Sequence, residues 1–154
     1  MLPSVELVKA MLDRTARAGR ELVYVAYEDG SHAVFELGPL GGAFPVDMPS
    51  VRFVLHTHPL PRFTPSVADI VTAYRISRAR GAPTPLFTAS RVGDRLVVYE
   101  IKVSPDADIE SLLRELGPIE AAAAVDAEAA SRAQHCRMVS RRDITITRFV
   151  LRPC

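Results

Sequence analysis

The sequence predicts a single α+β (mixed α/β) domain in which a mixed β-sheet is flanked by helices. The chain has 154 residues, a usual size for one domain. Hydrophobic residues make up 48% and charged residues 24%, which is ordinary for a globular protein and leaves enough apolar material for a core. Patterns typical of helices and of strands alternate in the order αββ βα ββ αα β. We therefore treat residues 1–154 as one domain.

The first part of the chain predicts a helix followed by strands. Apolar residues recur at helical spacing between Ser4, which can cap a helix, and Gly19, which can end it. Strands at 22–27 and 32–37 are expected to form a hairpin, because an Asp-Gly turn separates them. A third strand at 51–56 has the β-branched and aromatic content of a buried strand.

The middle of the chain predicts a second helix and two further strands. The helix is expected to begin after Pro65, with Ser66 as its N-cap, and to end near Gly81. Strands at 86–90 and 96–103 follow, joined by a turn.

The last third of the chain predicts two helices and a strand. Ser104-Pro105 indicates a helix start with proline at the first helical position, and Gly117-Pro118 indicates its end. An alanine-rich helix at 119–133 and a strand at 144–151 complete the expected elements. This segment can pack on the core, cover a site or form a homodimer, and we expect it to pack on the core.

Charge and hydropathy exclude several classes of protein. The 19 basic and 18 acidic residues leave a net charge of +1, so no overall field attracts nucleic acid or anionic lipid. No apolar run reaches the ~18 residues that a membrane span needs, and the N-terminus lacks a signal-peptide core. We therefore expect a soluble cytoplasmic protein. Asn is absent and Gln occurs once, which favours a thermophilic source. Of the 19 basic residues, 17 are arginine, a bias that a genome rich in G and C also explains.

The cysteines do not indicate a metal site. Cys136 and Cys154 form no CxxC pair, so a cysteine zinc knuckle is excluded. They are either free thiols or a disulfide that holds the C-terminus. His135 beside Cys136 offers two metal ligands without partners, which we interpret as incidental.

One segment carries chemistry: His56-Thr-His58-Pro59, followed by Ser66 and Asp69. Residues i and i+2 of a strand point to the same side, so both imidazoles can meet at one point. Asp69, one turn inside the next helix, can add a carboxylate there. Taken separately, His56 and His58 are two ordinary histidines, and Ser66 with Asp69 is a helix cap. A single site at which their side chains meet explains all four residues together. Two histidines and a carboxylate form a catalytic zinc site with an open position for water.

This pattern resembles the signature of the JAMM (MPN-type) zinc metallopeptidases, His-x-His-Pro-x6-Ser-x2-Asp. The resemblance implies a Zn²⁺ site with His56, His58 and Asp69 as ligands and Ser66 as a hydrogen-bond donor on the oxyanion side. It also implies the cytidine-deaminase-like JAMM architecture, with residues 4–103 as the catalytic core. Residues 104–154 lie outside the matched part and form a C-terminal extension.

The family also has a catalytic glutamate upstream of the histidines. Glu21 lies between the first helix and the first strand, where the family and its RadC-like relatives place this general base. Glu28 in the hairpin turn and Glu36 on the returning strand remain alternatives. The glycine-rich context that often follows the glutamate in ubiquitin-directed members is missing, which indicates a divergent member.

The resemblance implies hydrolysis of an amide or isopeptide bond. The expected substrate is the Gly-Gly tail of a ubiquitin-like or sulfur-carrier protein, or its conjugate. The loop 60–64, with Arg62 and Phe63, can form a wall of the substrate channel or be a connection that prolines stiffen.

Two other interpretations compete with a peptidase. RadC-like proteins share the motif spacing and are linked to DNA repair, so a nucleic-acid role is one alternative. The net charge of +1 disfavours it. The arginines that could contact phosphate are Arg75, Arg78, Arg80, Arg141 and Arg142. A non-catalytic MPN scaffold subunit is the second alternative, which the intact set of ligands disfavours.

Overall fold

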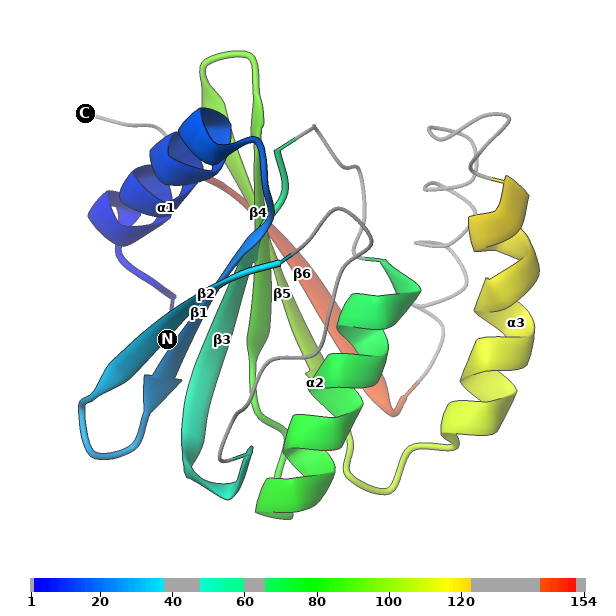
Figure 1. Cartoon of the computed structure of the whole chain (residues 1–154). Coiled ribbons are helices and arrows are strands. Elements are labelled where there is room, and N and C mark those ends of the chain that lie inside the picture. Colours follow the sequence, from blue (N-terminus) through cyan, green and yellow to red (C-terminus); the bar gives the residue numbers. More distant parts are fainter. Residues whose placement is uncertain (1, 38–47, 60–65, 123–141, 152–154) are drawn as a thin grey trace.

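The structure is a computed structural model that describes residues 2–37, 48–59, 66–122 and 142–151 (Figure 1). It confirms an α+β fold: a mixed sheet of six strands and three α-helices within the described residues. The helices are α1 (Val5–Ala18), α2 (Val67–Arg80) and α3 (Ile109–Ala122). None of the described helices is long and apolar enough to cross a membrane.

The strands lie in the order β2-β1-β3-β4-β5-β6. Their bounds are β1 (Leu22–Tyr27), β2 (His32–Glu36), β3 (Val51–Thr57), β4 (Leu86–Val92), β5 (Arg95–Val103) and β6 (Ile144–Leu151). Neighbouring strands are antiparallel except β3 and β4, which are parallel. A parallel pair needs a crossover, and α2 supplies it. The N-terminus of α2 therefore follows shortly after the C-terminal end of β3.

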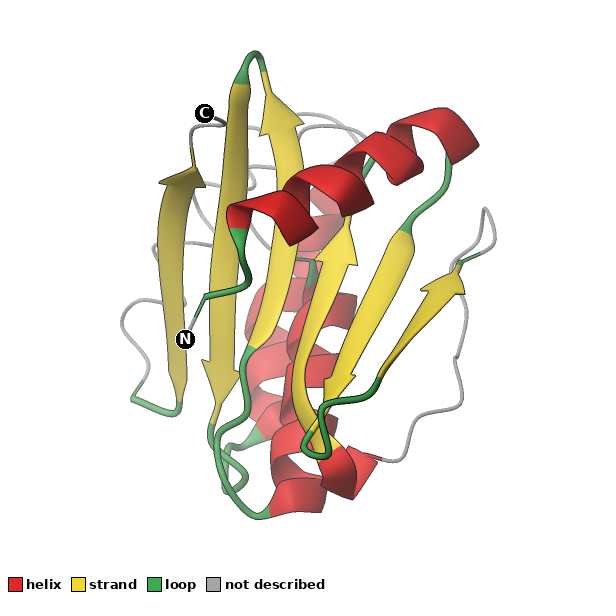
Figure 2. Cartoon of the chain, turned by 90° about the vertical axis from the view of Figure 1, so that its left-hand side faces the viewer, coloured by secondary structure: helices red, strands yellow, loops and turns green. Residues whose placement is uncertain are grey.

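The sheet has an apolar layer on each face. Figure 2 shows α1 crossing one face, while α2 and α3 lie behind the sheet. Under α1, Val8, Leu12, Leu22, Leu55 and Phe87 form one buried cluster. On the face of α2, the second cluster comprises residues such as Val23, Val25, Val54, Ile70 and Ile76. Alternate residues of β1 thus belong to opposite layers, as the two-residue period of a strand requires.

The predicted helix ends in the first part of the chain are confirmed. Ser4 accepts a hydrogen bond from the backbone N–H of Leu7 at 3.1 Å and caps α1. Gly19 ends α1 in the left-handed conformation with φ of 64°. Ser66 caps α2 in the same way as Ser4 caps α1, and Gly81 ends it. The expected strands and hairpin are also present, with bounds that differ by at most a few residues.

The prediction for the third helix was wrong at both ends. Ser104-Pro105 forms a turn, and α3 begins at Ile109, where Asp108 Oδ1 accepts a hydrogen bond from the Ser111 N–H at 3.1 Å. Asp108 therefore takes the capping position expected of Ser104. Pro118 lies inside α3, which continues to Ala122. The alanines that follow have the highest helix propensity, and this favours continuation although proline removes one backbone hydrogen bond.

Part of the predicted alanine-rich helix belongs to α3. Residues 119–122 continue that helix, and 123–133 lie outside the described residues. The last predicted strand is confirmed as β6, which pairs with β5 over its whole length. The C-terminal extension thus completes the sheet that carries the histidines.

The left-handed conformation of Gly19 gives a test of how α1 ends. No atom lies within 4 Å of a Cβ built on Gly19, so a substitution changes only the backbone energy. We expect Gly19→Ala to lower the free energy of unfolding by about 1 kcal/mol. Gly19→Asn should cost less, because asparagine tolerates this conformation better. Urea denaturation measures both variants, and equal stability of Gly19→Ala and the wild type would contradict the assignment.

Candidate metal centre

The register between β1 and β3 brings Glu21 to the histidines. Leu22 lies opposite Thr57, and Val23 lies opposite His56. Glu21, the residue before β1, therefore lies beside His58, the residue after β3. Strand alternation directs both imidazoles to the face that α2 covers.

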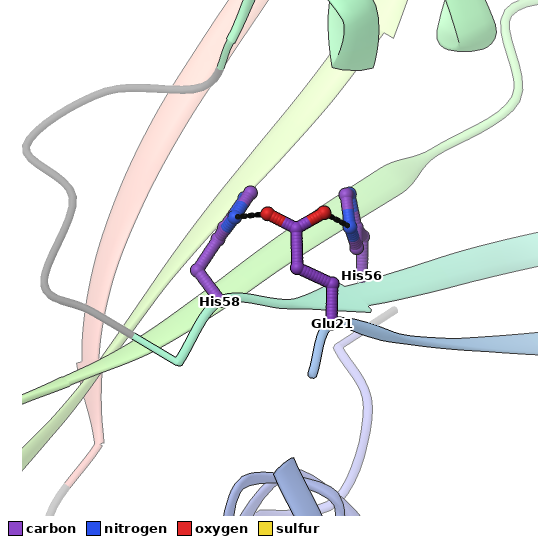
Figure 3. Close-up of side chains that lie close together, drawn as sticks. All are labelled: Glu21, His56 and His58. Carbon is purple, nitrogen blue, oxygen red and sulfur yellow. Dashed lines mark hydrogen bonds and ion pairs between the residues drawn. The ribbon is translucent and has the colours of Figure 1, made fainter. Parts of the chain in front are cut away.

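The Glu21 carboxylate bridges the two imidazoles (Figure 3). Its Oε2 lies 3.0 Å from His56 Nε2, and its Oε1 lies 3.2 Å from His58 Nδ1. The ring centroids of the histidines are 4.5 Å apart. One ligand atom from each of the three residues lies within 4.8 Å of the others, so this group can hold a metal ion.

Asp69 approaches the same histidines from α2. Its Oδ1 accepts a hydrogen bond from His56 Nδ1 at 2.6 Å, and its Oδ2 lies 3.4 Å from His58 Nε2. The Asp69 side chain is only 3% exposed, whereas that of Glu21 is 35% exposed. The histidines thus have a buried carboxylate on one side and a solvent-accessible carboxylate on the other.

A capping box fixes Asp69 at the start of α2. Ser66 Oγ donates to Asp69 Oδ2 at 2.8 Å, and the Ser66 N–H donates to the same oxygen at 3.1 Å. The Asp69 N–H in turn donates to Ser66 Oγ at 3.1 Å. A carboxylate in the first turn also interacts favourably with the helix dipole. These bonds leave Oδ1 of Asp69 directed at His56.

The cluster holds its charges by mutual hydrogen bonding. Burial alone would lower the pKa of His56, but its hydrogen bonds with Asp69 and Glu21 outweigh burial and raise that pKa to about 9. Burial would raise the pKa of Asp69, but the hydrogen bond from His56 and the nearby His58 imidazole hold that pKa well below its usual range. The hydrogen bonds from His56 and His58 likewise depress the pKa of Glu21.

The donor atoms fit a metal ion. His58 Nε2 is buried and has no hydrogen-bond partner, because its contact with Asp69 lacks hydrogen-bond geometry. An imidazole nitrogen left unpartnered in the interior is costly unless another donor or a cation meets it. Imidazole and carboxylate together suit a borderline divalent ion such as zinc. The structure supports a metal site without identifying the metal.

The other two candidate glutamates lie in ion pairs elsewhere. Glu28 in the hairpin turn contacts Arg80 at 2.5 Å. Glu36 on β2 contacts Arg14 at 3.6 Å, and both side chains are about half exposed. Of the three glutamates considered from the sequence, the structure brings only Glu21 to the histidines.

Several predicted features lie outside the described residues. These are the loop 60–64 with Arg62 and Phe63, and residues His135, Cys136, Arg141 and Cys154. Of the described arginines, Arg80 pairs with Glu28, and Arg78 donates to Tyr74 Oη at 3.4 Å and to the Pro105 carbonyl at 3.3 Å. These contacts engage both side chains within the molecule.

Thr57, the residue between the histidines, makes contacts that were not predicted from the sequence. Thr57 is fully buried on the opposite face of the sheet, where its hydroxyl meets Thr15 and the backbone of Leu22. Its face could have been predicted, because the alternation of the strand places Thr57 away from the imidazoles. Its partners are 42 and 35 residues distant, so sequence spacing does not indicate them.

Comparison of the chain with protein-family models, curated proteins and solved structures finds no significant match. Any function assigned to this chain therefore depends on the residues of the site. These provide two imidazoles between a partly exposed and a buried carboxylate.

The raised pKa of His56 predicts how stability depends on pH when divalent metal is removed with EDTA. His56 titrates near pH 9 in the folded chain and near 6.5 when unfolded. Its charge therefore stabilises the fold fully below pH 6.5, and this stabilisation is lost as the pH rises through 9. We expect the urea midpoint to fall over that window in the wild type. His56→Gln should lack this fall, whereas a variant of the exposed His32, His32→Gln, should retain it.

Proposed function

We propose that this chain is a zinc-dependent metallopeptidase of the JAMM type that hydrolyses an amide or isopeptide bond. The observation that carries this proposal is the placement of Glu21 and Asp69 on either side of His56 and His58. Two histidines and one carboxylate are a ligand set for catalytic zinc, and the second carboxylate remains for acid–base chemistry.

The different exposure of the two carboxylates supports different roles. Asp69 is buried and held by Ser66, which suits a ligand of fixed position together with His56 and His58. Glu21 is partly exposed, which suits a group that exchanges protons with water and substrate. When bound, zinc supplies a Lewis acid that makes water acidic and polarises a carbonyl.

Glu21 carries out the proton transfers in the proposed reaction. Its depressed pKa keeps the carboxylate ionised at neutral pH, so it can accept a proton from the attacking water. The same carboxyl group then gives this proton to the leaving amine. Glu21 is weakly basic while it accepts hydrogen bonds from both imidazoles. It becomes a stronger base when those bonds are exchanged for a bond to water.

Ser66 has two proposed roles. Its hydroxyl forms the capping box with Asp69, so it positions that carboxylate. The family resemblance adds donation to the developing oxyanion, for which the Ser66 hydroxyl has to turn from Asp69 Oδ2 toward the substrate. Ser66→Ala removes both roles.

The proposed substrate is the Gly-Gly tail of a ubiquitin-like or sulfur-carrier protein, as the resemblance implies. The order of helix, hairpin, histidine strand and following helix supports a JAMM architecture for residues 4–103. A mixed sheet that extends beyond the histidine strand is compatible with it. An extended tail that pairs with a strand edge near the site is a common mode of peptide recognition.

The same residues allow a second assignment of the ligands. Glu21, His56 and His58 form the group whose ligand atoms lie within 4.8 Å of one another. Asp69 would then orient His56 through its Nδ1, as a carboxylate behind a ligating histidine does. In this assignment Glu21 is a metal ligand and does not act as the general base.

Metal content distinguishes the two assignments. We expect about one zinc ion per chain in the wild type and at least tenfold weaker zinc binding in His58→Ala and Asp69→Asn, because each loses a ligand. Glu21→Gln should retain zinc if Glu21 is the base. If Glu21→Gln loses zinc and Asp69→Asn retains it, Glu21 is the ligand and Asp69 is the residue that orients His56. Inductively coupled plasma mass spectrometry and titration with a zinc chelator measure these effects. A wild-type chain that binds no zinc after reconstitution contradicts the metal site.

Hydrolysis tests the peptidase proposal. The substrate is a fusion in which a reporter follows the Gly-Gly tail of a small β-grasp modifier. We expect Glu21→Gln to lower kcat by about 100- to 10,000-fold, because it removes the general base. Glu36→Gln is a matched control, because Glu36 is exposed at the end of β2 and away from the histidines, and it should cleave like the wild type. Full zinc occupancy without cleavage by the wild type would contradict the peptidase assignment for this substrate.

A further inference from the structure

We propose that Thr57 is a positioning residue of the site, which fixes Glu21 through the backbone of Leu22. The proposal rests on the proposed role of Glu21 as general base. Thr57 separates the two histidines in the chain, but its side chain lies on the opposite face of the sheet, in the layer beneath α1.

Thr57 and Thr15 form a buried hydroxyl pair. Both residues are 0% exposed, and their Oγ1 atoms are 2.5 Å apart. The residues that surround them in this layer are mostly apolar, such as Leu12, Leu22 and Leu55. The two hydroxyls need hydrogen-bond partners in such a layer, because burial of a hydroxyl without a partner costs folding free energy.

The hydroxyl of Thr57 holds both backbone groups of Leu22. The Leu22 N–H donates to Thr57 Oγ1 at 3.3 Å, and Thr57 Oγ1 donates to the Leu22 carbonyl at 3.3 Å. Thr57 uses its proton for that carbonyl, so the Thr15 hydroxyl donates to Thr57 Oγ1. Thr15 thereby connects α1 to the start of β1.

Glu21 depends on these contacts because it precedes β1. Its carbonyl accepts a hydrogen bond from the Leu37 N–H at 2.9 Å, and its C-terminal neighbour is held by Thr57. Leu22 is also paired with Glu36 and Thr57 in the sheet, but it is the first residue of β1, so the hydroxyl contacts act at the strand end that carries Glu21. The histidines lie in or just after the other strand: the His58 N–H donates to the Ala89 carbonyl at 2.9 Å, and His56 is paired with Val23 and Thr88 inside β3. Loss of the Thr57 hydroxyl therefore acts on Glu21 more than on the histidines.

The expected consequence is a loss of rate without a loss of metal. A general base must stay within hydrogen-bond reach of its proton, and misplacement by about 1 Å can cost 100-fold in rate. Thr57→Val has nearly the same shape and lacks the hydroxyl. We expect it to lower kcat by at least tenfold, with KM and zinc affinity changed less than threefold. Thr57→Ser keeps the hydroxyl and should restore most of the rate.

Amide hydrogen exchange provides a readout that does not need activity. In Thr57→Val, the Leu22 amide should exchange at least tenfold faster relative to the Val25 amide of the same strand, and Thr57→Ser should resemble the wild type. The matched control is Ser77→Ala, because Ser77 is also 0% exposed and accepts a backbone hydrogen bond, from Thr84 at 3.0 Å, at the other end of α2. It should lower stability while leaving the Leu22 exchange ratio and kcat unchanged.

The outcomes separate this proposal from the proposed function. If Thr57→Val leaves the Leu22 exchange ratio unchanged, or if Ser77→Ala lowers kcat as much, the positioning role is overturned. A wild type that cleaves nothing contradicts the peptidase, while the exchange ratio still decides whether Thr57 holds Leu22. If Thr57→Val does not fold, Thr15→Val replaces it, since it removes the partner that donates to Thr57. An unchanged exchange ratio in Thr15→Val then overturns the role.

Discussion

The hydrogen bond between Asp69 and His56 is the interaction on which the site depends. It joins a carboxylate of α2 to an imidazole of β3 at 2.6 Å, in a region where Asp69 is 3% exposed. An ionised carboxylate is retained in the interior only with charged and hydrogen-bonding partners. Ser66 and the two histidines provide these partners. Burial of this one charge therefore requires β3, the start of α2 and both imidazoles to keep their relative positions.

The topology of the sheet explains why these groups meet. β3 and β4 are parallel, so the chain crosses over through α2, whose first turn lies beyond the end of β3. Functional groups of α/β proteins commonly gather where parallel strands end and helices begin. Here the helix N-terminus favours the negative charge of Asp69. The antiparallel neighbour β1 starts beside the C-terminal end of β3, and it brings Glu21 to the opposite side of the histidines.

Local patterns predicted most of the fold and one half of the site. The two-residue period places His56 and His58 on one face, and the capping box of Ser66 and Asp69 is visible in the sequence. The contact of Glu21 depends on a β1–β3 register that links residues 35 positions apart, so position in the chain favoured Glu21 without establishing its partners. The end predicted at Pro118 was wrong because the favourable residues after it continue α3.

The capping box has a consequence for how such chains diverge. Ser66 and Asp69 stabilise the start of α2 whether or not the site performs chemistry. A descendant without any chemistry at this site would still be selected to keep them, because their loss frays a helix that packs on the sheet. Glu21 is partly exposed and caps no helix, so its replacement leaves the capping box of α2 intact. The proposed role of Glu21 as general base therefore predicts that the residue at position 21, more than the downstream motif, distinguishes an active descendant from an inactive one.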